Sequence, residues 1–305
     1  MTESARQCLR RSIGETISDG PYAIIDFPNY ANPGDSAIWV GARQLLETLF
    51  QRPPSYVSTF RHFNTGQCRM RTAGGTVFFL GGGNFGSLYG KHHQTRLNVL
   101  KQLADMKIVL LPLSVAEDTT SHTNSAFVSD TRAALDGCRN LKIFVREKVS
   151  RARFKEDYGF DSTLCPDTAH WCSLPNVRST MTAIGLLRRD GEALKASMGK
   201  DLPIDATFDW SDIKSIKYLN RIGKASPLLL QQSLRLWAFD FFAERKTWAA
   251  SRWLGRGDQV LTDRLHGVIL ASMMNRKVTA ADNRTGKVAS YVETWAKLLP
   301  RVSLQ

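Results

Sequence analysis

The chain has 305 residues, and 43% of them are hydrophobic, which is enough to fill the cores of two ordinary domains. No apolar run reaches the roughly 18 residues that a membrane span needs, and the N-terminal segment lacks a signal-peptide pattern, so we expect a cytoplasmic protein. The 41 Lys and Arg residues outnumber the 28 Asp and Glu residues by 13, which predicts anionic partners: phosphorylated small molecules, lipid head groups or nucleic acid.

The distribution of charge and the spacing of the cysteines limit the partners and metal sites that we expect. The basic residues are spread along the chain instead of forming a tail or a stripe, so we expect no nucleic acid partner. The five cysteines include no C-x-x-C pair, which indicates reduced thiols and argues against a structural zinc site. No cluster of carboxylates or histidines demands a metal ion, so we expect none.

In the first half of the chain, short apolar runs alternate with amphipathic segments. The predicted strands are residues 22–27, 76–81, 107–113 and 141–145, followed by one that ends at residue 164. The predicted helices are residues 35–50, 92–106 and 124–137. Continuously apolar strands separated by helices are typical of a parallel sheet that is covered on both faces. We therefore predict a Rossmann-like α/β domain over residues 1–175.

The same pattern restarts after a polar, Pro-containing segment at residues 172–179. The predicted strands are residues 181–189, 203–208, 258–262 and 277–281, and residues 226–254 form one long helical stretch. This predicts a second Rossmann-like domain over residues 176–305, with a cleft between the two. Because ligands of such sheets bind beyond the carboxyl ends of the strands, the loops after the strands are the first candidates for a site.

The loop after the first strand carries one candidate catalytic group. Asn32, Pro33 and Gly34 predict a turn, after which Asp35 or Ser36 can serve as the N-cap of the next helix. On one interpretation Asp35 only caps this helix. On the other, its carboxylate faces the cleft and accepts a proton from a substrate hydroxyl.

A glycine-rich loop, "FFLGGGNFG", follows the strand at residues 76–81. Gly82 and Gly83 let the backbone come close to a ligand or to a neighbouring strand, and the residue types do not choose between these interpretations. Asn84 interrupts the spacing of the dinucleotide-binding fingerprint, and no Gly-Lys-Ser/Thr follows as in a P-loop. A nicotinamide cofactor is therefore not expected.

Charged residues follow two later strands of the first half. Arg146 ends the strand at residues 141–145, where its charge opposes the dipole of the next helix, so we expect an anion beside it. Asp167 and His170 follow the strand that ends at residue 164. Their types fit a structural role and a functional role equally well.

The segment "LTDRLHGVILASMMN" places charged groups between an apparent buried strand and a buried helix. Asp263 is the predicted N-cap of that helix, and Arg264 and His266 lie in its first turn. A helix N-terminus that carries a guanidinium and an imidazole suits a carboxylate or a phosphate, and an imidazole can donate a proton near neutral pH. Lys287, after the next strand, supplies another positive group.

Five motifs in register are similar to those of the polysaccharide pyruvyl transferases. They are "NYANPGDSAIW", "FFLGGGNFG", "VREKVS", "LCPDTAHW" and "LTDRLHGVILASMMNRKV", and the resemblance extends from about residue 24 to about residue 295. It implies two Rossmann-like domains in the GT-B arrangement of glycosyltransferases. It also implies transfer of the pyruvyl group of phosphoenolpyruvate to two hydroxyls of a sugar, with release of phosphate, in exopolysaccharide biosynthesis.

The resemblance assigns roles residue by residue. Arg146, Arg264 and His266 are implied to hold phosphoenolpyruvate, with Lys287 as a further ligand, and Asp35 is implied to act on the acceptor hydroxyl. Phosphoenolpyruvate is then a donor substrate, and no cofactor is expected. His266 either protonates C3 of the donor or assists departure of the phosphate, and the sequence leaves both roles open.

Two other functions remain as alternatives at this stage. One is a GT-B glycosyltransferase that uses a nucleotide sugar, and the other is a non-catalytic module that binds an anionic polymer. For the transferase we expect a lipid-linked or nucleotide-linked acceptor, and peripheral contact with an anionic membrane through residues 234–254. Burial of residues 234–254 in the core explains their composition equally well.

Overall fold

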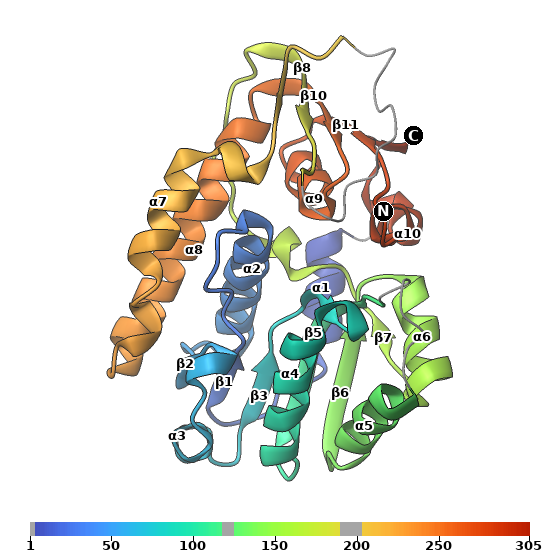
Figure 1. Cartoon of the computed structure of the whole chain (residues 1–305). Helices are drawn as coiled ribbons and strands as arrows, with labels where there is room; N and C mark the ends of the chain where they lie inside the picture. The colour runs from blue at the N-terminus through green and yellow to red at the C-terminus, as the bar shows by residue number, and fades with distance from the viewer. Residues whose placement is uncertain (1–3, 118–124, 190–202) are drawn as a thin grey trace.

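A computed structural model describes residues 4–117, 125–189 and 203–305, and it contains two parallel β-sheets (Figure 1). The first sheet, in the lower half of Figure 1, has the strand order β2-β1-β3-β5-β6-β7, and β4 also pairs with β5. Its strands are β1 (Tyr22–Ile25), β2 (Tyr56–Ser58), β3 (Thr76–Phe79), β4 (Gly82–Phe85), β5 (Lys107–Val115), β6 (Asn140–Val145) and β7 (Thr163–Leu164). Every pairing in it is parallel, as predicted.

The second sheet has the order β12-β11-β10-β8-β9 and is also parallel throughout. Its strands are β8 (Met181–Leu186), β9 (Ala206–Phe208), β10 (Gly257–Thr262), β11 (Lys277–Ala280) and β12 (Val302–Leu304). A parallel pair needs a crossover connection, so helices separate most of these strands along the chain. The predicted α/β class with parallel sheets is therefore confirmed.

Helices cover both faces of the first sheet. The helices within the described residues are α1 (Ala5–Gly14), α2 (Pro33–Phe50), α3 (Thr65–Arg71), α4 (Gly90–Gln102), α5 (Ser125–Asp136), α6 (Lys148–Tyr158), α7 (Lys214–Gly223), α8 (Gln232–Leu254), α9 (Leu265–Met273) and α10 (Lys287–Thr294). In β1, Tyr22 and Ile24 join a buried cluster with α1 and α2, whereas Ala23 and Ile25 join a second cluster with α3 to α6. Burial on both faces explains why β1 is apolar without alternation.

The first buried cluster continues beyond the first sheet. It includes residues of α8 and α9 and reaches the core of the second sheet, and α8 packs alongside α2 (Figure 1). The predicted boundary at residues 175/176 falls between β7 and β8, and so between the two sheets. Helix α8 packs against the first half of the chain and so joins residues 1–175 to residues 176–305. Their division into two separate domains therefore stays a prediction.

The second half departs from the prediction in three main places. Residues 226–254 do not form one helix: a 3-10 turn at Ser226–Leu228 is followed by an extended residue, Gln231, before α8 begins. Pro227 lies in that turn, where its ring and missing N–H stop a helix from continuing through it. Helix α7 and strand β12 were not predicted at all. Residue 124 of the predicted helix 124–137 lies outside the described residues.

Two predictions from composition concern the whole fold. None of the five cysteines, all of which lie in the described ranges, forms a disulfide, in agreement with the expected reduced thiols. Within the described ranges, no helix combines the length and the apolar character needed to cross a membrane.

Candidate active site

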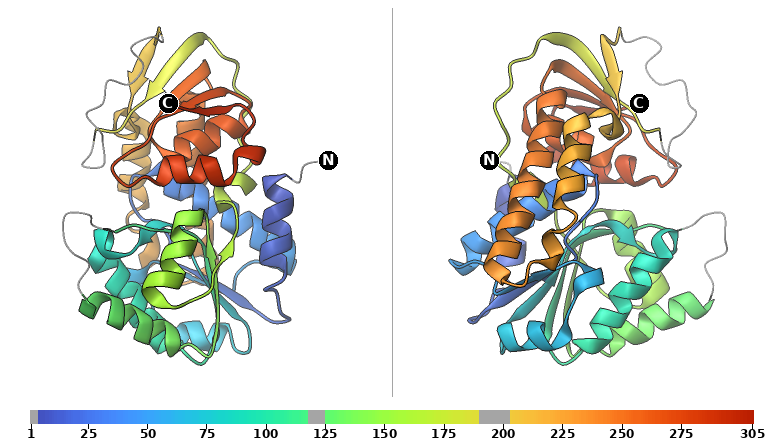
Figure 2. Two further views of the ribbon diagram at one scale, coloured as in Figure 1. Left: turned by 90° about the vertical axis from the view of Figure 1, so that its right-hand side faces the viewer. Right: turned by 60° about the vertical axis from the view of Figure 1, so that its left-hand side comes forward.

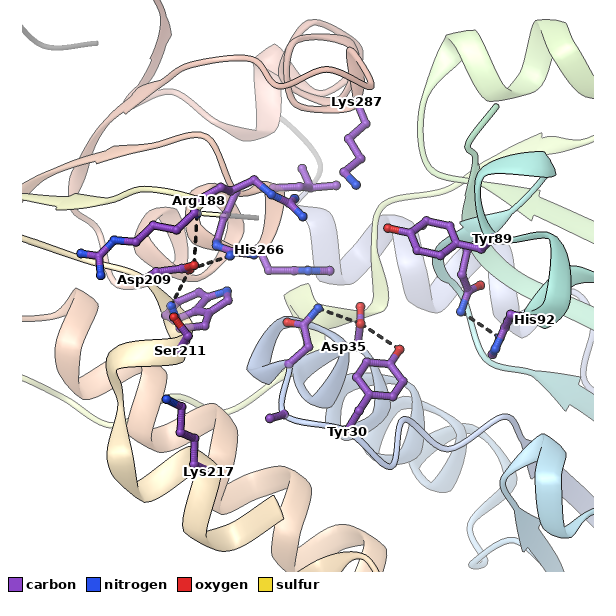
Figure 3. Close-up of a pocket in the computed structure, with 18 of the residues that line it drawn as sticks. Tyr30, Asp35, Tyr89, His92, Arg188, Asp209, Ser211, Lys217, His266 and Lys287 are labelled. Atoms are coloured by element: carbon purple, nitrogen blue, oxygen red, sulfur yellow. Dashed lines mark hydrogen bonds and ion pairs between the residues drawn. The ribbon is translucent and has the colours of Figure 1, made fainter. Parts of the chain in front are cut away.

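A pocket of about 710 Å³ lies between the carboxyl ends of the two sheets (Figure 3). Its walls combine residues that follow β1, β4 and β6 with residues that follow β8 to β11. Eight of the ten predicted site residues line it: Asn32, Asp35, Gly83, Asn84, Arg146, Arg264, His266 and Lys287. The loops after the strands therefore meet in space, as the rule for parallel sheets predicts.

Asp35 lies in the first turn of α2 and faces this pocket. The predicted cap was wrong, because neither Asp35 nor Ser36 caps the helix: Asn32 is the N-cap, and its side chain accepts a hydrogen bond from the backbone N–H of Gly34 at 3.0 Å. Pro33 takes the first helical position, which moves the start of α2 two residues earlier than predicted. Asp35 Oδ2 instead accepts hydrogen bonds from Asn32 Nδ2 at 2.8 Å and from the Tyr30 hydroxyl at 2.9 Å (Figure 3).

A buried carboxylate, Asp167, joins the two halves of the site. Its Oδ2 accepts a hydrogen bond from Arg146 Nη1 at 2.6 Å and lies 3.4 Å from Nε2 of His266. Burial acts to raise the pKa of Asp167, but His266 and Arg146 together hold it well below its ordinary value. Arg146 from the first sheet and His266 from the second therefore converge on one ionised carboxylate, and Asp167 has a positioning role that its sequence context left open.

The anion expected beside Arg146 is present within the protein itself. Arg146 is buried, and besides Asp167 it has Glu147 at 3.7 Å from its Nε. The same Nε donates to Ser114 Oγ at 2.6 Å. These contacts hold the guanidinium rigidly at the pocket wall.

His170 belongs to the structural side of this network. Its Nε2 lies 3.0 Å from the Tyr291 hydroxyl, which also accepts the backbone N–H of Asp167 at 3.1 Å. Burial lowers the pKa of His170 to about 4. A buried histidine in this environment is neutral at physiological pH, and it anchors α10 beneath the pocket.

The segment around Arg264 differs from its prediction by one residue. Asp263 is not the N-cap; Arg264 occupies that position without a side-chain cap, and its N–H donates to Thr262 Oγ1 at 3.1 Å. Asp263 is buried and accepts the backbone N–H of Arg188 at 2.9 Å, which ties the end of β10 to the end of β8. The Arg264 guanidinium pairs with Asp209 at 2.5 Å.

The glycines after β3 allow close packing of the backbone and leave open space in the pocket. A Cβ at Gly81 would lie 2.1 Å from the carbonyl oxygen of Pro112, so this glycine permits tight packing against β5. A Cβ at Gly83 would lie 3.1 Å from Arg146 Nη2 and 3.7 Å from Lys287 Nζ. Gly83 therefore faces two cations of the pocket, and its lack of a side chain leaves space beside them. Gly82 does not line the pocket, but its φ of +122° favours glycine.

The walls of the pocket are strongly cationic. Six Lys or Arg residues line it, against two Asp residues. Three of the six were predicted, and the other three are Arg188, Arg189 and Lys217. Among the described residues, no group of three or more His, Cys, Asp or Glu is arranged to hold a metal ion. The site is therefore suited to a small molecule that carries several negative charges.

A family model described as "Polysaccharide pyruvyl transferase" matches residues 32–284, which includes Asp35, Arg146, Arg264 and His266. The chain belongs to the polysaccharide pyruvyl transferase family. Membership implies a transferase, and it confirms the resemblance found in the motifs. Lys287 lies just beyond the matched range, so its assignment rests on its place in the pocket.

Named relatives agree with this assignment. The chain is 27% identical over 292 residues to a Bacillus subtilis protein named "Putative pyruvyl transferase EpsO", and the match covers 92% of this chain and 86% of that protein. It is 24% identical over 299 residues to "Pyruvyl transferase 1" of Schizosaccharomyces pombe, covering 90% of this chain and 69% of that protein. A crystal structure of a functionally uncharacterised Klebsiella pneumoniae protein has the same fold, with a TM-score of 0.64, 16% identity and coverage of 100% and 99%.

In this family member, several pocket residues escaped sequence analysis. Asp209 and Trp210 follow β9, and Arg188 and Arg189 follow β8, so the strand-end rule could have found all four. Lys217 could not be found in this way, because it lies on the unpredicted helix α7.

Three side chains of the first half were also missed. Tyr30, Tyr89 and His92 line the side of the pocket around Asp35 and Asn84 (Figure 3). His92 Nε2 lies 3.0 Å from Asp26 Oδ2 and 3.0 Å from Asn84 Nδ2. Tyr30 lies in the quoted motif "NYANPGDSAIW", whereas Tyr89 and His92 belong to none of the quoted motifs.

Gly34 sets the position of the His266 ring. A Cβ at Gly34 would lie 2.4 Å from His266 Nδ1, and Asp167 holds the opposite side of the ring, so the ring has no room to yield. We expect Gly34→Ala to displace the imidazole and to lower kcat/KM by about 10²-fold, the loss typical of a misplacement of about 1 Å. Steady-state kinetics measure kcat/KM, and a thermal melt shows whether the variant is still folded.

The matched control is Gly66→Ala. Gly66 occupies the same second helical position in α3, but a Cβ there would meet its nearest atom only at 3.6 Å. This variant should keep full activity. Equal losses in both variants would show that the helix position, and not the contact with His266, is responsible.

Lys246 of α8 is a buried cation behind Asp35. Its Nζ donates to the Tyr30 carbonyl at 3.0 Å, and burial lowers its pKa to about 8 from 10.5. Between pH 8 and 10.5 the Lys246 amine carries a proton in the unfolded chain but not in the folded protein. Folding therefore releases a proton in this window, and the contribution of Lys246 to the free energy of unfolding increases as the pH rises. The free energy of unfolding of the wild type, relative to that of Lys246→Met, should therefore increase by about 1–3 kcal/mol from pH 8 to pH 10.5.

Urea unfolding at several pH values measures this difference. Lys214→Met serves as the control, because Lys214 is exposed on α7. A constant difference between the wild type and Lys246→Met from pH 8 to 10.5 would contradict the prediction.

Proposed function

We propose that this chain transfers the pyruvyl group of phosphoenolpyruvate to two hydroxyls of a sugar, forming a ketal and releasing phosphate, in exopolysaccharide biosynthesis. The observation that carries this proposal is the convergence of cations from both sheets on one pocket, beside a carboxylate and an imidazole. Family membership supports the pyruvyl group as the one transferred.

The donor fits the charge of the pocket. Phosphoenolpyruvate carries up to three negative charges on its carboxylate and phosphate. We assign Arg146, Arg264, His266 and Lys287 to hold them, on the wall formed by β6, β10 and the N-terminus of α10. A guanidinium binds a carboxylate or a phosphate in two-point geometry, and a helix N-terminus adds favourable backbone N–H groups.

Asp35 is assigned as the general base. It removes the proton of the first acceptor hydroxyl as that oxygen bonds to C2 of the donor, while C3 gains a proton and becomes a methyl group. The second hydroxyl then attacks C2 as the C2–O bond to phosphate breaks, and phosphate leaves with that electron pair. Of the two hydroxyl protons, one is balanced by the proton on C3 and the other by the proton on the released phosphate.

The arrangement of the two sheets supports a GT-B-like architecture. Each sheet directs its carboxyl edge to the same pocket, and we assign the donor to residues 176–305, assisted by Arg146, and the acceptor to the Asp35 side. The acceptor is proposed to be a lipid-linked saccharide at the cytoplasmic face of the membrane. Tyr30 and Tyr89, both partly exposed in the pocket, offer aromatic faces to its sugar rings.

The test is an assay of the purified chain with phosphoenolpyruvate and a panel of sugar lipids in deuterium oxide. We expect phosphate release together with an acceptor that gains a pyruvate ketal, whose methyl group carries one solvent deuterium. Turnover only with a nucleotide sugar would overturn the proposal in favour of a glycosyltransferase. Binding of anionic polymers without any turnover would overturn it in favour of a binding module.

A further inference from the structure

Helices α7 and α8 and their connection present an exposed apolar surface, which we call the α7–α8 face. In Figure 2 the two helices lie side by side on the outside of the molecule. The most exposed apolar side chains of the α7–α8 face are Leu230 at 90%, Tyr218 at 66%, Leu228 at 65% and Trp237 at 62%. Leu234, Ile222, Phe241 and Trp248 extend the face along both helices.

Helix α8 has two distinct apolar sides. Ala238, Phe239, Ala243 and Ala250 are buried and belong to the main core, so core burial explains one side of the helix. The other side is a stripe in which the Trp237 and Phe241 rings stack at 5.5 Å, and the Arg245 guanidinium lies 5.4 Å from Phe241 and 5.6 Å from Trp248. Core burial therefore leaves this aromatic stripe unexplained.

The charge of the α7–α8 face has one sign. Between Lys214 and Leu254, a range that the structure describes in full, six Lys or Arg residues are exposed and no Asp or Glu is exposed. The six are Lys214, Lys217, Arg221, Lys224, Arg245 and Arg252. Of the two acidic residues of α8, Glu244 is half-buried, and Asp240 accepts a hydrogen bond from Trp39 Nε1 at 2.9 Å and pairs with Arg43 at 3.2 Å.

The composition of this face matches one kind of partner. Tryptophan and tyrosine between leucines and basic residues are the side chains that settle at the boundary between lipid head groups and acyl chains. A second copy of the same face would bring six cations against six cations, which disfavours a symmetric dimer. Anionic lipid head groups complement this charge instead.

We propose that the α7–α8 face docks on an anionic lipid bilayer, with Leu228 and Leu230 of the connection inserted deepest. The face is continuous with the pocket, because Lys217 of α7 lines it (Figure 3). Docking thus places the pocket beside the bilayer surface, where a lipid-linked acceptor lies; this last step rests on the proposed function, whereas docking itself does not.

The experiment measures cosedimentation of the full chain with vesicles of phosphatidylcholine alone or mixed with phosphatidylglycerol. We expect binding to the mixed vesicles only, weakened by salt and accompanied by a blue shift of tryptophan fluorescence. The variant Leu230→Ser/Trp237→Ser should bind at least tenfold more weakly. The control Met70→Ser removes an equally exposed apolar side chain, 69% exposed on α3, and should bind like the wild type.

Three results would overturn docking: no binding by the wild type, equal losses in both variants, or a dimer by light scattering that Leu230→Ser/Trp237→Ser disrupts without any vesicle binding. The proposed function is judged separately on a water-soluble sugar acceptor. There the Leu230→Ser/Trp237→Ser variant should match the wild type, because neither residue lines the pocket. Vesicle binding without pyruvyl transfer would leave docking supported and the proposed function refuted.

Discussion

Replacing Asp35 by asparagine is expected to lower kcat for ketal formation by about 10²–10⁴-fold, the usual contribution of a general base. The amide keeps the shape of the side chain and can still accept from Tyr30 and Asn32, but it cannot take a proton from the acceptor hydroxyl. Binding of phosphoenolpyruvate should change little, because Asp35 is not among the residues that we assign to hold the donor. Phosphate release and a fluorescence titration with phosphoenolpyruvate measure the two quantities.

Glu47→Gln is the matched control for this substitution. It makes the same chemical change on the same helix, but Glu47 is partly exposed at the far end of α2 and pairs with Arg43. This variant should retain wild-type turnover. If Asp35→Asn kept more than a tenth of the activity, Asp35 would be a structural residue of the first turn of α2 and not the base.

Replacing His266 by glutamine should also lower kcat by about 10²–10⁴-fold, and it can separate the two roles of the imidazole. If His266 protonates C3, exchange of solvent deuterium into the C3 hydrogens of phosphoenolpyruvate should disappear together with transfer. If His266 assists departure of the phosphate, exchange should persist while phosphate release falls. Mass spectrometry of recovered phosphoenolpyruvate distinguishes the two outcomes.

The control for His266→Gln is His62→Gln, at a histidine outside the pocket. A second comparison uses Asp167→Asn, which leaves the imidazole in place but removes the carboxylate beside it. We expect that variant also to lower kcat, because the ionised carboxylate that holds both the imidazole and the Arg146 guanidinium is lost. Full activity of His266→Gln would remove this residue from the mechanism.

Local sequence was sufficient for β1, β3, β5 and β6 and for the loops that follow them, whereas the short strands β2 and β4 were not predicted. Their apolar runs are continuous because both faces are buried, and this signal is read over a few adjacent residues. The cap of α2 was misplaced by a few residues because Asn32 and Asp35 are both good capping residues, and only their contacts decide between them. Helix α7 escaped because its short amphipathic pattern follows an unrecognised turn.

The sequence by itself determined the α/β class, the motif residues around the pocket and the excess of positive charge, since these depend on residue types and short spacings. Only the tertiary structure decided that Asp167, distant in sequence from His266, pairs with Arg146 and holds the imidazole. It also decided that Lys246 is buried behind Asp35 while Trp237 on the same helix faces outward. The physical reason is that burial and charge pairing arise where α2, α8 and the carboxyl edges of both sheets meet, and no local pattern records which segments those are.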